Sequence, residues 1–313
     1  MLFRSRLALA IALTFSMAAC DSPEPTATAA AKLPAGISLV KVQEPVPGAL
    51  AIPYKKYKLN NGLTVIVHED NSDPLVHVDV TYHVGSSREE PGKSGFAHFF
   101  EHMMFQGSEH VADEQHFKII TEAGGSMNGS TNTDRTNYFQ TVPVNQLEKV
   151  LWLESDRMGF LVDAVTEQKF EVQRETVKNE RGQRIDNRPY GRLSERANEL
   201  LYPANHPYAW PVIGYMDDLN RANVNDVKAF FLRWYGPNNA TITIGGAVNA
   251  EEVLPLVQKY FGEIPSGPAV EPLPKELFSL SADRYLSFED NIQFPLISIQ
   301  FPTTSSSWQY PAR

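Results

Sequence analysis

Apolar and polar residues alternate along the first folded part of the chain. Between Val76 and Val84 every second residue is apolar and the residues between them are polar, which predicts a β-strand with one buried face. Upstream, Asn61-Gly62 separates two short runs, 57–59 and 63–67, and this pair of residues is a strong signal for a tight hairpin turn. The pattern therefore predicts antiparallel strands at the start of the folded region.

Further along the chain, extended and helical patterns are mixed. The expected strands after the Gly124-Gly125 turn lie at 126–132 and 136–142, and a later strand lies at 240–244. The expected helices cover residues 112–122, 145–160, 167–188, 224–234 and 250–260. Because strands and helices do not alternate strictly, the sequence predicts an α+β domain with helices packed on a largely antiparallel sheet.

Composition and charge exclude several classes of protein. Of the 313 residues, 42% are apolar and 21% are charged, values that are typical of a globular protein. The net charge of -9 argues against nucleic acid as a partner, because phosphate binding requires clustered Lys and Arg. Cys20 is the only cysteine, so we expect neither a disulfide within the chain nor a cysteine-based zinc site.

The N-terminus has the features of a secretory signal. Two arginines precede an apolar stretch at 7–17, which is too short to span a bilayer. The stretch ends in Met17-Ala18-Ala19-Cys20, which resembles the lipobox of bacterial lipoproteins. We therefore expect residues 1–19 to be a signal peptide and Cys20 to be lipidated, in the bacterial cell envelope on the periplasmic or extracellular face. The alternative is an ordinary secretory signal followed by a chance cysteine.

Composition also divides the rest of the chain. Residues 20–52 are rich in Pro, Ala and Thr, and we expect them to be a flexible linker behind the lipid anchor. Residues 53–265 form the predicted folded domain. Residues 266–313 begin with a Pro-rich connection, and 296–301 is the expected first strand of a second, incomplete domain.

The most informative local pattern is His98-Phe99-Phe100-Glu101-His102. A helix places His98, Glu101 and His102 within about 100° of arc, and most of the neighbouring apolar residues face the opposite side. Ser94 is the expected N-cap. Two imidazoles one turn apart, with a carboxylate between them, can hold a divalent metal and leave a base beside a coordinated water. Two hydrogen-bonded histidines of a packed core are the alternative interpretation.

A catalytic zinc site usually has three protein ligands. The helix expected at 167–188 offers three glutamates, Glu171, Glu175 and Glu180. Here the sequence resembles the pitrilysin family, which includes insulin-degrading enzymes and mitochondrial processing peptidases. The resemblance covers about residues 55–265 and rests on four segments whose order and separation match the family's N-terminal peptidase domain, 94–105, 125–128, 134–138 and 177–181.

The resemblance implies a role for each matching residue. His98, His102 and Glu180 match the ligands of a single zinc ion, and Glu101 matches the catalytic base. Asn128 lies on the strand that pairs with the substrate backbone in family members. These matches predict a zinc metalloendopeptidase that hydrolyses oligopeptides or unfolded polypeptide segments.

The sequence departs from the family pattern in two places. Many members have a second glutamate two turns before the glutamate ligand, and here Gln173 stands there, on the same helix face as Glu180. The second domain, which helps to hold the substrate in the family, is incomplete. The alternative function is therefore a non-catalytic or partner-dependent peptide-binding lipoprotein subunit. The expected partners are peptides, the membrane through the lipid anchor, and a partner subunit or C-terminal half.

Other histidines offer weaker candidates for a site. His77, Asp79 and His83 share one strand face, but strand geometry separates the two histidines by about 20 Å, so we do not expect them to share a metal. His110 and His116 follow the expected metal-binding helix, and we expect both to be solvated surface residues.

Overall fold

The computed structural model describes residues 33–273 and 280–301. The predicted signal peptide and Cys20 lie outside the described residues, and the folded unit begins at Leu33. Within the described part of the chain, no helix has the length and apolar character needed to cross a membrane.

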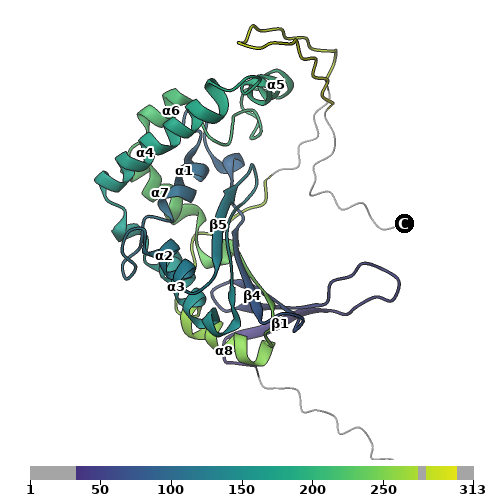
Figure 1. The fold of residues 1–313 in the computed structure, drawn as a ribbon, viewed down its shortest axis with the longest axis vertical. Helices are drawn as coiled ribbons and strands as arrows, with labels where there is room; N and C mark the ends of the chain where they lie inside the picture. Colours follow the sequence, from purple (N-terminus) through teal and green to yellow (C-terminus); the bar gives the residue numbers. More distant parts are fainter. Residues whose placement is uncertain (1–32, 274–279, 302–313) are drawn as a thin grey trace, which may run out of the picture. The chain divides into compact units, whose positions relative to one another are not determined.

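Seven strands form one sheet, and Figure 1 shows how they are arranged. The strands are β1 (Ile37–Gln43), β2 (Tyr54–Leu59), β3 (Thr64–Glu69), β4 (Leu75–Tyr82), β5 (Ser126–Thr131), β6 (Thr136–Pro143) and β7 (Ala240–Gly246). Their spatial order is β1-β2-β3-β7-β4-β6-β5, so β1 and β5 are the edge strands. Among these strands only β3 and β7 pair in parallel, which confirms the predicted α+β fold with a largely antiparallel sheet.

Eight α-helices accompany the sheet in the described residues. They are α1 (Phe96–Met103), α2 (Gln115–Glu122), α3 (Leu147–Gly159), α4 (Glu167–Arg181), α5 (Leu193–Leu201), α6 (Met216–Arg221), α7 (Val224–Trp234) and α8 (Ala250–Phe261). All the helices expected from the sequence are present. Helices α5 and α6 were not predicted. The six residues of α6 include only two apolar side chains, whereas Leu193, Leu200 and Leu201 of α5 do have a helical spacing that the prediction missed.

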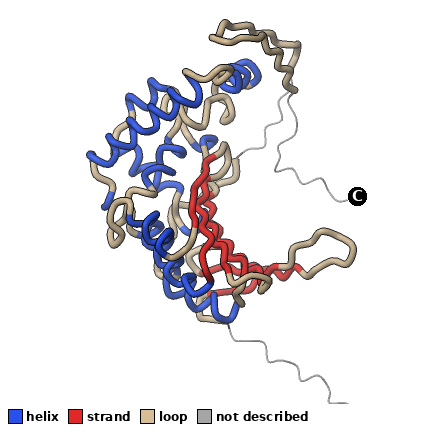
Figure 2. Tube along the Cα trace, viewed as in Figure 1, coloured by secondary structure: helices blue, strands red, loops and turns tan. Residues whose placement is uncertain are grey.

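The sheet has one covered and one open face, and Figure 2 shows the helices on one side of the strands. Val76, Val78, Val80 and Tyr82 of β4 are fully buried, and β4 contacts α3. The residues between them are exposed or half-buried. An antiparallel sheet that is covered on one face requires this alternation, so the alternation at 76–84 predicted β4 correctly.

The Asn61-Gly62 turn joins β2 and β3 as predicted, and it also connects the sheet to α8. Gly62 has a φ of 91°, a conformation that favours glycine. The Asn61 side-chain amide donates hydrogen bonds to the backbone oxygens of Phe261 and Ile264, at 2.7 and 2.9 Å. The turn therefore fixes the end of α8 against the hairpin.

Two predictions at the ends of the folded region are wrong. Part of the expected linker forms β1, which pairs with β2 although Leu39, Val40 and Val42 are exposed. Main-chain pairing at an edge needs no buried side-chain face, so the hydrophobic pattern did not reveal this strand. Residues 296–301, the expected first strand of the second domain, form no strand in the described part of the chain.

Candidate metal centre

Helix α1 carries three of the candidate residues, and its start is not capped by Ser94. Gly95 is the N-cap residue, with a φ of 90°, and a Cβ there would lie 2.8 Å from the Cα of Gly214. The buried Glu89 carboxylate accepts hydrogen bonds from the N–H groups of Gly95 and Ala97, at 2.9 and 2.8 Å. The Ser94 hydroxyl donates to a carboxylate of α6 instead. The expected Ser94 cap is therefore wrong, because Glu89 satisfies the free N–H groups.

The apolar face of α1 packs against two other helices. The rings of Phe99 and Phe170 of α4 have centroids 5.0 Å apart, and Phe100 stacks on Phe231 of α7 at 5.0 Å. Both phenylalanines of α1 are buried, as the helical spacing predicted. This packing fixes the rotation of α1 about its axis and holds α1 beside α4.

Helix α4 brings Glu180 to the histidines. Thr166 caps the start of α4 by accepting a hydrogen bond from the Lys169 N–H at 3.3 Å. At the other end, the buried Arg181 donates to the backbone oxygen of Gly214 at 2.7 Å and to a carboxylate of α5 at 2.9 Å. These contacts hold both ends of α4 and so position its last turn, which contains Glu180.

The other glutamates of α4 lie away from this cluster, as predicted. Glu171 pairs with Arg174 at 3.3 Å, and Glu175 pairs with Lys178 at 2.8 Å. Gln173 is buried on the inner face of the helix. The glutamate that the family resemblance indicated is therefore the one that lies with the two histidines.

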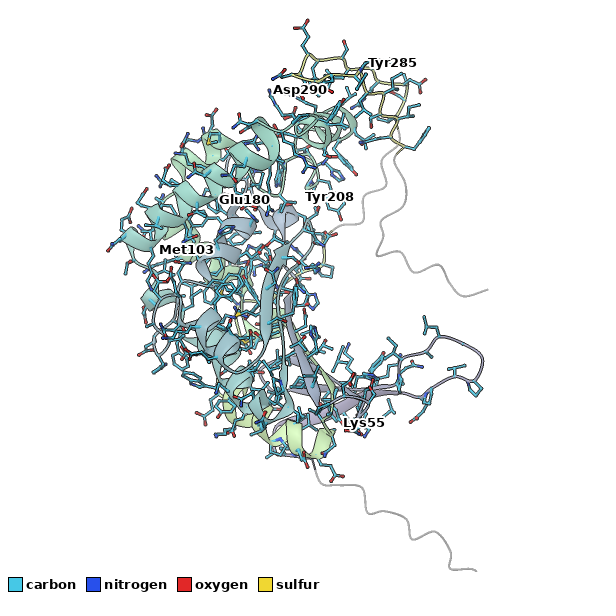
Figure 3. All side chains as sticks on the ribbon, viewed as in Figure 1. Lys55, Met103, Glu180, Tyr208, Tyr285 and Asp290 are labelled. Atoms are coloured by element: carbon cyan, nitrogen blue, oxygen red, sulfur yellow. The ribbon has the colours of Figure 1, made fainter. Side chains whose placement is uncertain are left out.

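His98, His102 and Glu180 form a compact group in which one ligand atom from each residue lies within 4.8 Å of the others. Glu180 Oε2 lies 3.6 Å from His98 Nε2 and 3.2 Å from His102 Nε2. The three side chains are 13%, 23% and 17% exposed, so the group is sheltered but reachable from solvent. Figure 3 labels Glu180 on its helix. No other group with metal-binding spacing occurs in the described residues.

The protonation states suit a divalent cation. Burial, together with the nearby His102, lowers the pKa of His98 to about 4, so its imidazole is neutral near pH 7. The hydrogen bond with His102 lowers the pKa of Glu180, which keeps that carboxylate ionised. Neutral imidazoles and a carboxylate are the forms that bind metal. Two imidazoles and one carboxylate with a solvent-facing side fit a catalytic zinc site.

Glu101 lies beside this group, between α1 and β5. Its Oε2 accepts a hydrogen bond from the Thr131 hydroxyl at 2.5 Å. Burial raises the pKa of Glu101, although the Thr131 hydrogen bond opposes this shift. Asn128 lies on the edge strand β5, where its Oδ1 accepts a hydrogen bond from the Gly129 N–H at 2.9 Å. A half-buried carboxylate and the edge strand β5 therefore lie beside the helix that carries the two histidines.

The sequence did not single out two residues that contact these candidates. Thr131 is 30 residues from Glu101 in the chain, and only the folded strand brings them together. Arg184 lies in a π-helical turn after α4 and places Nη1 2.7 Å from Glu180 Oε1. The spacing of four residues between Glu180 and Arg184 is a signal for this contact, whereas no local pattern marks Thr131.

The remaining histidines differ from expectation in one case. His77 and His83 contact threonine hydroxyls at 2.9 and 3.1 Å. His110 is half-exposed, with Nδ1 2.6 Å from Asp156 Oδ1. His116 is buried, so the prediction of a solvated surface residue is wrong. The face of α2 that packs inward carries His116, and burial lowers its pKa well below the ordinary value.

Comparison with known families identifies the chain. Residues 64–204 match the model of the insulinase family, peptidase family M16, and residues 221–312 match the model described as the peptidase M16 inactive domain. The chain belongs to the pitrilysin/insulinase-type zinc metallopeptidase family. The second match begins within α6, so the family boundary precedes the domain end that we expected near residue 265.

Several relatives of this chain are named as zinc proteases. The zinc protease PqqE of Helicobacter pylori is 38% identical over 209 residues, which is 66% of this chain and 46% of that protein. The probable zinc protease PqqL of Escherichia coli is 28% identical over 74% of this chain and 25% of that protein. The chain thus spans about half or less of the length of these relatives.

Solved structures show the same fold. A protease from Helicobacter pylori, at 35% identity, has a TM-score of 0.67 over 71% of this chain and 52% of that protein. The periplasmic protease PqqL from Escherichia coli, at 23% identity, has a TM-score of 0.64 over 74% of this chain and 25% of that protein. The second likeness concerns the fold alone.

Proposed function

We propose that this chain is the zinc-binding catalytic part of a metalloendopeptidase. The proposal rests on one observation. His98, His102 and Glu180 each place one ligand atom within 4.8 Å of the others, and Glu101 lies on the same helix as the two histidines. The names of the relatives as zinc proteases support zinc as the metal. We infer a single ion, held by these three side chains, with Gln173 as a neutral neighbour on the inner face of α4.

The chemistry follows from the neighbours of the metal-binding group. When bound, zinc lowers the pKa of a coordinated water and polarises a carbonyl. Glu101 acts as the general base, because burial raises its pKa toward the range in which a carboxylate both takes and releases a proton. Its carboxylate accepts a proton from water and passes that proton to the leaving amine.

The substrates that fit this site are extended peptides. The edge strand β5 contacts α1, and Glu101 hydrogen-bonds to its last residue, Thr131. A peptide that pairs with β5 through its main chain lies alongside the base, and main-chain pairing tolerates varied side chains. Asn128 then contributes to binding from within this strand. We therefore propose oligopeptides and unfolded polypeptide segments as substrates.

Location and partners extend the proposal to the whole protein. The similar PqqL of Escherichia coli is a periplasmic protease, which supports a bacterial envelope location for this chain. We propose that Cys20 anchors the chain by a lipid. Because the chain spans 46% of the PqqE relative, we also propose that full activity requires a second half, from the same polypeptide or from a partner subunit.

The variant Glu101→Gln tests the proposed reaction. The amide keeps the size of the side chain and removes the base, so we expect cleavage of a fluorogenic peptide to fall by roughly 100-fold or more. The bound zinc, measured by atomic emission, stays at one ion per chain in both proteins. Equal cleavage by wild type and variant contradicts the role of Glu101. Peptide binding without cleavage by the zinc-loaded wild type supports the alternative, a non-catalytic peptide-binding subunit.

A further inference from the structure

Thr131, the last residue of β5, is placed to control the carboxylate of Glu101. Its Oγ1 lies 2.5 Å from Glu101 Oε2 and 3.4 Å from Thr136 Oγ1. A hydroxyl has one proton to donate, and a charged acceptor at the shorter distance makes the stronger hydrogen bond. The Thr131 proton is therefore directed to Glu101.

The second oxygen of the Glu101 carboxylate, Oε1, is not held by Thr131 and can accept a proton. Glu101 Oε1 has no hydrogen-bond partner among the described residues. It lies over the backbone of Gly129, 3.2 Å from the position that a Cβ would take there. By holding Oε2, the Thr131 hydroxyl fixes the rotation of the carboxylate, so that Oε1 faces the middle of β5.

Thr131 is itself held by the sheet. It pairs with Thr136 at the end of the β5–β6 ladder, whose register has no shift. Thr136 is fully buried, and its hydroxyl donates to the backbone oxygen of Val84 at 2.9 Å. Strand pairing thus sets the position of the Thr131 hydroxyl, and a strand positions a side chain more precisely than a loop does.

We propose that Thr131 is a positioning residue that orients Glu101 for proton transfer and links the base to the strand that receives the peptide. This inference rests on the proposed function. One strand then performs two tasks, because its edge aligns the substrate backbone while its last side chain aligns the base. An orientation error of about 1 Å at a reacting group can reduce a rate roughly 100-fold.

Three variants of the full chain test the proposal. Thr131→Val removes the hydroxyl and keeps the shape, whereas Thr131→Ser keeps the hydroxyl. Thr141→Val is the matched control, because Thr141 lies on β6, where its hydroxyl contacts His77. We expect Thr131→Val to lower kcat roughly 10- to 100-fold, with KM and zinc content within about 2-fold of wild type. Thr131→Ser recovers most of kcat, and Thr141→Val behaves as wild type.

Other results overturn the proposal. A Thr131→Val protein with normal kcat, with loss of zinc, or with a change in KM alone shows that Thr131 does not position the base. Failure of Thr131→Ser to recover kcat shows that the hydroxyl is not the cause.

Crystal structures of wild type and Thr131→Val test the positioning role without relying on peptidase activity, because they show the orientation of Glu101 directly. If the zinc-loaded wild type cleaves no peptide even when its second half or partner subunit is present, the proposed function fails. The Glu101 side chain then decides the present inference separately. We expect it to rotate away from Gly129 in Thr131→Val, and an unchanged side chain overturns the positioning role.

Discussion

The two edges of the sheet differ in regularity. The β5 strand pairs with β6 in continuous register and contacts α1 and α2. The β1 strand pairs with β2 with a register shift between Leu39 and Lys41, and apolar side chains there are exposed. Bulges and lysines are common means of blocking further pairing at a sheet edge. The regular edge, beside Glu101, is the one suited to pairing with a peptide.

The largest expected effect is a loss of zinc affinity when Glu180 is replaced. We expect Glu180→Gln to weaken zinc binding by roughly 100-fold or more, because loss of a direct ligand exceeds the usual cost of losing an outer contact. Competition with a chromogenic chelator measures the affinity. The control is Glu175→Gln on the same helix, where the exposed carboxylate pairs with Lys178. Similar zinc affinities for the two variants would exclude Glu180 as a ligand.

A smaller effect, on the rate of cleavage, is expected when backbone N–H groups of the peptide substrate are blocked. Pairing with β5 uses alternate backbone N–H groups of the peptide, and each hydrogen bond contributes about 1 kcal/mol. N-methylation of a peptide nitrogen that donates to β5 should therefore slow cleavage by roughly 10-fold. N-methylation of the nitrogens between these, which face away from β5, should have a smaller effect. Val40→Lys on the exposed β1 edge should leave these values unchanged. Equal tolerance of N-methylation at every position would contradict strand pairing.

The smallest expected effect is a pH-dependent change in Tm on loss of the ion pair between His110 and Asp156. His110 and Asp156 pair near α1, and Asp156 raises the pKa of His110 through a hydrogen bond and its charge. This stabilisation is complete below the ordinary pKa of 6.5 and is lost as pH rises through the raised value. We therefore expect the difference in Tm between wild type and His110→Gln to be largest near pH 5 and to shrink toward pH 9.

The control for that pH dependence is Lys55→Gln. Lys55 pairs with Glu69 at 3.1 Å on the β1 side of the sheet. The hydrogen bond with Glu69 raises the pKa of Lys55 above 10.5, so Lys55 keeps its charge between pH 5 and pH 9. A constant Tm difference for His110→Gln over the same range would contradict the His110 prediction.

The sequence predicted the parts of the site that depend on local periodicity. Helical spacing placed His98, Glu101 and His102 on one face of α1, and it placed Gln173 on the same face of α4 as Glu180. Those predictions succeed because each depends on the geometry of one helix. The resemblance to the pitrilysin family, rather than periodicity, linked the two helices.

The sequence missed features that depend on tertiary contacts. The cap of α1 comes from Glu89 rather than Ser94, because the close approach of Gly95 to Gly214 sets the start of the helix. His116 is buried because α2 packs that face inward. Thr131 reaches Glu101 only after β5 has paired with β6. None of these contacts follows from the order of neighbouring residues.

Anomalous scattering at the zinc edge from crystals of the zinc-loaded protein tests the central claim most directly. We expect one peak, contacted by Nε2 of His98, Nε2 of His102 and Oε2 of Glu180, with Glu101 beside it but not bound to it. A strong peak at another place, or none at this group after zinc loading, would contradict the assignment of these residues as a zinc centre.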